Sequence, residues 1–161
     1  WLNASGIITQ CIKIKEGKIP LSAFIEPDSF KIYMNDVGLL CSKFGIPTNM
    51  IIVDNDNLDN FKGALAENYV CSSLVKSGLT PYYWESKGIA ELDFIVQDKE
   101  GNIIPIEVKS GEHTRSKSLN VFRNSYKIPY SIRISTKNFG YENNIKSIPL
   151  YSVFCLDELA K

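Results

Sequence analysis

The stretch Glu91–Gly111, ELDFIVQDKEGNIIPIEVKSG, is the most strand-like part of the chain. Two apolar runs flank DKEGN, whose glycine suits a three-residue hairpin loop that closes Asp98 against Asn102. The two runs therefore predict an antiparallel hairpin. Two carboxylates, Asp93 and Glu107, nevertheless stand inside these runs, where a buried strand usually carries Val or Ile.

The predicted loop also fixes the register of the hairpin. Because side chains alternate between faces, counting back from Asp98 and Asn102 places Asp93 opposite Glu107. Directly opposed residues lie about 5 Å apart at Cβ, and two carboxylates at that separation need a cation. Mg²⁺ is the natural candidate, because it takes oxygen ligands and is often held by one or two carboxylates. The alternative is that Lys109 neutralises Glu107 on an exposed surface.

A third carboxylate, Glu67, lies on the clearest predicted helix, which ends near Lys76 and is followed by the helix breakers Gly78 and Pro81. At 100° per residue, Glu67 falls between apolar positions of the kind that normally face packed structure. If this flank covers the sheet, Glu67 approaches the predicted carboxylate pair. The alternative is that its side chain reaches solvent at the edge of the apolar stripe.

The rest of the chain predicts an α/β or α+β layered domain. We expect a helix end over residues 1–5, a polar loop over 53–60 that caps the long helix, and a second helix near 116–126. Strands are expected over 7–14, within 21–35 before a helix from about Asp36, and over 82–86, 130–136 and 148–154.

The composition is typical of a soluble globular domain, with 161 residues, 44% hydrophobic and 22% charged residues, and a net charge of +0. No apolar run is long enough to span a bilayer, and the chain opens on Trp1, which we interpret as the start of a piece of a longer protein. The four cysteines contain no C-x-x-C pair and His113 is the single histidine, so we expect reduced thiols in a cytoplasmic protein rather than a zinc site.

A helix glutamate, a strand aspartate and E-x-K on the next strand resemble the pattern of the PD-(D/E)XK nuclease superfamily. The matching residues are Glu67, Asp93, Glu107 and Lys109, while Leu92 stands where that pattern has proline. The resemblance implies a restriction-endonuclease-like core, with a mixed central sheet flanked by helices.

A second resemblance covers almost the whole chain. The segments WLNASGII, FKIYMNDVGLL, FKGALAENYV, YYWESKGIAELDFIV, IIPIEVKSGEHTRSKSLNVF and IRIS are similar to an uncharacterised domain that follows the AAA+ module of a group of prokaryotic ATPases. This resemblance implies a small winged-helix-like piece over residues 1–55 and a nuclease-like domain over residues 56–161. No G-x-x-x-x-G-K-[ST] loop is present, so ATP hydrolysis is implied only for the parent protein.

The resemblance further implies Mg²⁺ or Mn²⁺ as the cofactor, with Asp93 and Glu107 as the main ligands, Glu67 as an accessory ligand and the Val108 carbonyl completing the shell. Lys109 would position the attacking water or neutralise the charge that develops on the phosphate.

DNA is the expected substrate, and a basic segment offers phosphate contacts through four residues: Arg115, Lys117, Arg123 and Lys127. The alternative for this segment is an ordinary solvated face. The alternative for the domain is a catalytically silent fold that serves the ATPase as a DNA-binding or regulatory module, and the sequence leaves the oligomeric state open.

Overall fold

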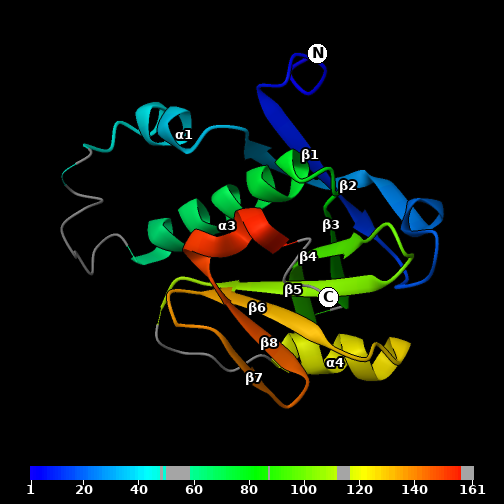
Figure 1. The fold of residues 1–161 in the computed structure, drawn as a ribbon. Helices are drawn as coiled ribbons and strands as arrows, with labels where there is room; N and C mark the ends of the chain where they lie inside the picture. Colours follow the sequence, from blue (N-terminus) through cyan, green and yellow to red (C-terminus); the bar gives the residue numbers. More distant parts are fainter. Residues whose placement is uncertain (48, 50–58, 87, 112–116, 157–161) are drawn as a thin grey trace.

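The computed structural model describes residues 1–47, 49, 59–86, 88–111 and 117–156, and these form a mixed sheet with helices on both faces (Figure 1). The strands are β1 (Ile8–Ile14), β2 (Ile25–Met34), β3 (Tyr82–Ser86), β4 (Ala90–Gln97), β5 (Ile103–Lys109), β6 (Ser131–Ser135), β7 (Gly140–Glu142) and β8 (Ile145–Pro149). The α-helices of the described part are α1 (Val37–Lys43), α3 (Asp59–Lys76) and α4 (Lys117–Tyr126), with 3-10 helices η1 (Leu21–Phe24) and η3 (Leu150–Cys155).

The described strands form one eight-stranded sheet in the order β2-β1-β3-β4-β5-β6-β8-β7. Antiparallel pairing joins β1 to β2, β3 to β4, β4 to β5 and β7 to β8. The pairs β1–β3, β5–β6 and β6–β8 are parallel. The prediction of a mixed α/β layered domain is therefore confirmed.

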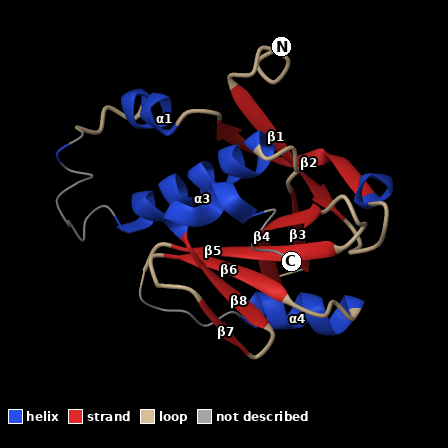
Figure 2. Ribbon diagram, viewed as in Figure 1, coloured by secondary structure: helices blue, strands red, loops and turns tan. Residues whose placement is uncertain are grey.

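The two faces of the sheet carry separate cores, because α3 covers one face and α4 the other (Figure 2). Under α3, Val70 and Leu74 pack with Phe94 and Ile106. Under α4, the fully buried Phe122 packs in a second cluster with Trp84 of β3 and Leu92 of β4. Burying a large apolar side chain of this kind stabilises the fold by about 1.5–3 kcal/mol, so the central strands are fixed from both sides.

The hairpin between β4 and β5 has the predicted loop and register. Asp98 donates its backbone N–H to the Asn102 carbonyl at 3.0 Å, and Gly101 adopts a φ of +89° that glycine accepts without strain. The pairing runs from Gln97 and Ile103 to Phe94 and Ile106 without a register shift. Over this stretch the loop therefore sets which residues of β4 and β5 lie opposite one another.

Helix boundaries follow the predicted signals where the structure describes them. The Asp36 carboxylate accepts a hydrogen bond from the backbone N–H of Leu39 at 2.7 Å and caps α1. Gly78, with a φ of +79°, ends the turn after α3, and Leu79 donates its N–H to the Leu74 carbonyl. The predicted capping loop before α3 lies outside the described residues.

Three local predictions were wrong. Residues 1–5 form turns rather than a helix end, and the strand after residue 21 is long rather than short, since β2 spans Ile25–Met34. The strand expected over 148–154 ends at Pro149, where η3 begins, and β8 starts earlier, at Ile145. The apolar run over 148–154 fits a partly buried 3-10 helix as well as a strand, because periodicity does not separate the two in short segments.

The described part of the predicted winged-helix-like piece, residues 1–55, contributes β1, β2 and α1. Its two strands belong to the same sheet as the later strands, with β1 beside β3. Cys11 and Tyr33 lie in the same core cluster as Val70 and Phe94. Residues 8–34 therefore share their hydrophobic core with the rest of the domain, and the expected boundary at residues 55 and 56 lies outside the described residues.

The four cysteines are free thiols, as expected. Burial raises the pKa of Cys11 and raises that of Cys71 to about 12, so these two thiols stay protonated at neutral pH. No described helix has the length and apolar character needed to cross a membrane.

Candidate active site

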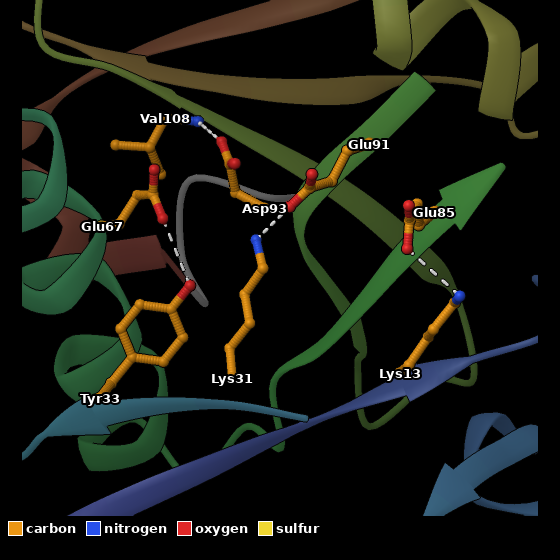
Figure 3. Close-up of polar contacts among 8 residues, drawn as sticks. All are labelled: Lys13, Lys31, Tyr33, Glu67, Glu85, Glu91, Asp93 and Val108. Carbon is orange, nitrogen blue, oxygen red and sulfur yellow. Dashed lines mark hydrogen bonds and ion pairs between the residues drawn. The ribbon is translucent and has the colours of Figure 1, made fainter. Parts of the chain in front are cut away.

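The candidate site lies where β4 and β5 diverge. The ladder between these strands reaches Phe94 and Ile106, and in a continued register Val108 would pair with Leu92. That pair does not form, although Leu92 still pairs with Trp84 of β3 on the other edge of β4. The Asp93 Oδ2 accepts the Val108 N–H at 2.7 Å, taking the place of the missing ladder bond (Figure 3).

The direction of the Val108 carbonyl follows from that of its N–H. In an extended strand the N–H and C=O of one residue point to the same neighbouring strand. The Val108 carbonyl is therefore directed, like its N–H, toward β4, beyond the last β4–β5 pair. An oxygen in this position suits the predicted role of Val108 as a backbone ligand.

A cleft of about 500 Å³ opens at the fork and brings the predicted residues together. Glu67, Asp93, Glu107 and Lys109 all line it. The other charged side chains of its described lining are Lys31, Glu85 and Glu91. The prediction that a helix glutamate meets the two strand carboxylates is confirmed as geometry.

The arrangement of the two strand carboxylates differs from a simple opposed pair. Ile106 and Val108 pack in the cluster under α3, so alternation directs Glu107 toward the other face, where Ser118 of α4 also lines the cleft. Asp93 turns its carboxylate toward the main chain of β5. The prediction that Asp93 pairs directly opposite Glu107 is therefore wrong, because the β4–β5 pairing ends at Phe94 and Ile106, and both carboxylates line the cleft beyond that point.

Glu107 is the most buried acidic side chain of the site, with 5% of its surface exposed. Its Oε1 accepts from Lys109 Nζ at 2.7 Å, while its Oε2 is buried without a hydrogen-bond partner. A buried acceptor without a donor costs about 1–3 kcal/mol, more when it is charged. The alternative predicted an ion pair between Glu107 and Lys109 on an exposed surface. The ion pair forms, but Glu107 is buried rather than exposed.

Glu67 enters the cleft from α3 because the neighbouring face of that helix is buried. Its Oε2 accepts from the Tyr33 hydroxyl of β2 at 3.3 Å. Burial, followed by the charge of Glu67, raises the pKa of Tyr33, so the hydroxyl stays protonated and donates. The alternative that Glu67 turns to bulk solvent is wrong, because its side chain is half-buried in the cleft lining.

Asp93 has the most perturbed carboxyl group among the described residues. Burial, together with the nearby charge of Glu67, raises its pKa to about 7, against the lowering effects of the Val108 N–H and of Lys31. The charge of Glu107 raises it further. An acid that is half protonated near neutral pH lies in a site that lacks positive charge.

Lys31 is a cleft residue that sequence reasoning missed. It rises from β2 toward Asp93 and Glu91, and its Nζ forms an ion pair with the Glu91 carboxylate (Figure 3). The ammonium also lies 5.1 Å from the centre of the Tyr83 ring. The sequence signal was present, since Lys31 alternates with Tyr33, but the approach of Lys31 to Glu91 of β4, distant in the sequence, could not be read from local pattern.

Arg115 falls outside the described residues, and the three predicted nucleic-acid residues that the structure describes do not line the cleft, although Lys117 is next to the lining residue Ser118. Lys117 and Lys127 are exposed at the two ends of α4. Arg123 donates from Nη1 to the Asn143 carbonyl at 2.9 Å, which ties α4 to the turn between β7 and β8. Arg123 therefore has a structural contact of its own.

The donor set fits a hard divalent cation in chemistry but is not assembled as a cage. Within the described ranges, no group of three or more His, Cys, Asp or Glu side chains is arranged to hold a metal ion. Asp93 and Glu107 nevertheless supply carboxylate oxygens, one of them buried without a partner, beside a backbone carbonyl. Mg²⁺ commonly keeps several waters and uses only one or two carboxylates, so these groups suffice as ligands.

Comparison with known proteins gives one family match. Residues 62–153 match the family described as Domain of unknown function (DUF4143). The match includes Glu67, Asp93, Glu107 and Lys109 and begins after β2, so it is shorter than the nearly complete resemblance expected from the sequence. No curated protein and no solved structure matches the chain.

Proposed function

The chain belongs to the DUF4143 family, and we propose that its cleft is the active site of a divalent-metal-dependent phosphodiesterase of PD-(D/E)XK type that cuts DNA. One observation carries the proposal. Glu67, Asp93, Glu107 and Lys109 come from one helix and two strands, yet they line a single cleft, where one carboxylate oxygen is buried without a partner and one carboxyl has a pKa near 7. A structural ion pair alone does not explain a three-carboxylate cluster of this kind.

Each residue has a role that its position supports. Asp93 and Glu107 would hold the cation, with the Val108 carbonyl as the predicted backbone ligand, and Glu67 would orient water from the side of α3. When bound, Mg²⁺ or Mn²⁺ supplies Lewis-acid polarisation of the phosphate and lowers the pKa of a bound water. Lys109, paired with Glu107 through Nζ, would donate to the water or to a phosphate oxygen as charge develops.

The test is cleavage of supercoiled and linear DNA by the purified chain over a range of Mg²⁺ and Mn²⁺ concentrations. We expect the wild type to nick DNA only with metal, and Asp93→Ala or Lys109→Ala to abolish the reaction while the fold persists. Glu100→Ala, an exposed carboxylate in the β4–β5 loop, is the matched control and should cleave like the wild type. Equal cleavage by wild type and Asp93→Ala would identify a contaminant and refute the proposal.

A second function is favoured by the internal contacts that two of the carboxylates already make. Glu107 pairs with Lys109, Asp93 bonds to Val108, and the described residues contain no assembled metal cage. A nuclease-like fold without turnover, kept as a DNA-binding or regulatory module, is consistent with this arrangement. It requires that no cleavage occurs with either metal, while Lys117→Ala and Lys127→Ala still weaken salt-dependent DNA binding.

The proposed setting is the C-terminal region of a cytoplasmic ATPase. The family is often found with ATPases, which supports an AAA+ module in the parent protein. The restriction-endonuclease-like topology belongs to the same proposal. Its support is the mixed sheet, the helices on both faces and the position of the motif residues at a strand fork.

A further inference from the structure

The cleft is strongly acidic for a site that receives a phosphodiester. Its described lining carries five carboxylates, Glu67, Glu85, Glu91, Asp93 and Glu107, and two amines, Lys31 and Lys109. With every group ionised this leaves three uncompensated negative charges, from five minus two. A DNA phosphate approaching such a surface is repelled unless cations face it.

Lys31 is suited to face the phosphate from the wall opposite Lys109. It comes from β2 at one end of the sheet order, whereas Lys109 comes from β5 across the fork. The Lys31 ammonium lies over the Tyr83 ring, and Figure 3 shows it directed into the space between Glu91 and Asp93. The two lysines thus line one cleft with different partners, Glu91 for Lys31 and Glu107 for Lys109.

The present partner of Lys31 is exchangeable. Glu91 is exposed over 51% of its side chain, and ion pairs to exposed carboxylates contribute little, because water screens them. Burial lowers the pKa of Lys31, but the ion pair with Glu91 and the charges of Asp93 and Glu67 outweigh this effect and raise it. The ammonium therefore stays charged and keeps a weakly held partner.

We propose that Lys31 binds a non-bridging oxygen of the substrate phosphodiester, exchanging Glu91 for the phosphate once a divalent cation occupies the carboxylates. This inference rests on the proposed phosphodiester substrate. Lysine is a common phosphate ligand because it presents a compact charge with freely rotating donors. The exchange brings β2, which lies outside the residues matched to the family, into the substrate-binding surface.

The experiment compares Lys31→Met with Lys13→Met. Lys13 is the matched control, because it lies on the neighbouring strand β1 and forms ion pairs with Glu85 and Glu26, but it is not part of the described cleft lining. Affinity for a short fluorescent DNA duplex is measured with Ca²⁺ over a range of salt concentrations. Mn²⁺ affinity without DNA is measured by calorimetry.

We expect Lys31→Met to weaken DNA binding about tenfold at low salt and to reduce the salt slope by about 1. Its Mn²⁺ affinity should be unchanged or higher, because a positive charge has left the carboxylates. Lys13→Met should bind DNA like the wild type. Lys31→Arg should restore most of the affinity, and circular dichroism should show the native fold in all variants.

The outcomes separate this inference from the proposed nuclease function. Equal DNA affinity of Lys31→Met and Lys13→Met would overturn the role of Lys31, even if the wild type cleaves DNA. A wild type that binds no DNA with Ca²⁺ would overturn it as well. Lys31-dependent binding without any cleavage would support the phosphate contact and refute the nuclease. If Lys31→Met does not fold, the comparison of Lys31→Gln with Lys31→Arg decides the question in the same way.

Discussion

At Asp93, folding places a carboxyl group where its ionised form is unfavourable. Its pKa rises from 3.8 to about 7, first through burial and then through the charge of Glu67. Between these values the folded protein holds a proton that the unfolded chain has released. The free energy of unfolding of the metal-free protein should therefore fall as the pH rises from about 4 to about 7, and Asp93 should add no further change above that.

Asp93→Asn should raise the stability of the metal-free protein at pH 8, because an amide oxygen can still accept the Val108 N–H without carrying charge. The pKa change corresponds to about 4 kcal/mol at 1.36 kcal/mol per pH unit. Partial solvent contact reduces this to about 1–3 kcal/mol. Urea unfolding at pH 5 and pH 8 in the presence of a chelator measures this difference in the free energy of unfolding. If wild type and variant showed the same pH dependence, the prediction would be contradicted.

Metal binding should depend on the same proton. Because Asp93 must be ionised to act as a ligand, Mn²⁺ should stabilise the protein more at pH 8 than at pH 6. At about 100 times its dissociation constant a ligand adds about 2.7 kcal/mol to the free energy of unfolding. Thermal unfolding with and without Mn²⁺ measures the effect. In Glu107→Gln the stabilisation by Mn²⁺ should be strongly reduced. If Mn²⁺ raised the unfolding temperature of this variant as much as that of the wild type, Glu107 would be excluded as a ligand.

At the scale of elements, α3 is anchored to the outer edge of β2 by one buried side chain. Asn68 accepts the Met34 N–H and donates to the Met34 carbonyl, each at 2.8 Å. An edge strand otherwise leaves such groups unpaired, so the amide acts as a short substitute for another strand. This contact also fixes the neighbouring Glu67 beside Tyr33.

Asn68→Ala should lower the free energy of unfolding by about 2–3 kcal/mol, because two hydrogen bonds are lost and a cavity is left. Lys76→Ala, near the exposed end of the same helix, should change it by less than about 0.5 kcal/mol. Chemical denaturation of both variants measures the difference. Equal stability of the two would show that the helix is held by its apolar face alone.

Local signals explain which elements could be predicted. Gly101 and the loop length set the β4–β5 register, and Asp36 and Gly78 mark helix ends, because each acts within a few residues. The fork at Asp93 could not be foreseen, since the β4–β5 pairing ends at Phe94 and Ile106, next to the register shift in the pairing of β4 with β3. Lys31 was missed for the same reason, because its partner Glu91 lies on a strand that is distant in sequence.

At the scale of the whole molecule, the family match and the structural unit differ in extent. The match covers residues 62–153, whereas β1 and β2 extend the sheet and share its core. A fragment starting at Asp59 would lose buried Cys11, Ile14, Leu21 and Tyr33. We expect it to unfold without cooperativity, as measured by circular dichroism during heating. A cooperative transition at the temperature of the full chain would show that the matched region is a complete domain.

The bond between the Asp93 carboxylate and the Val108 amide makes a main-chain proton an indicator of what the cleft holds. In the metal-free protein the Val108 nitrogen that carries this proton lies 2.7 Å from Oδ2 of Asp93, a carboxyl with a pKa of about 7. Its nuclear magnetic resonance frequency should follow that titration. Addition of Mg²⁺ should move the signal and remove its dependence on pH, because the carboxylate then stays ionised. A single ¹⁵N-labelled sample would thus report cofactor occupancy without any substrate, and a signal indifferent to both pH and Mg²⁺ would place the cation elsewhere.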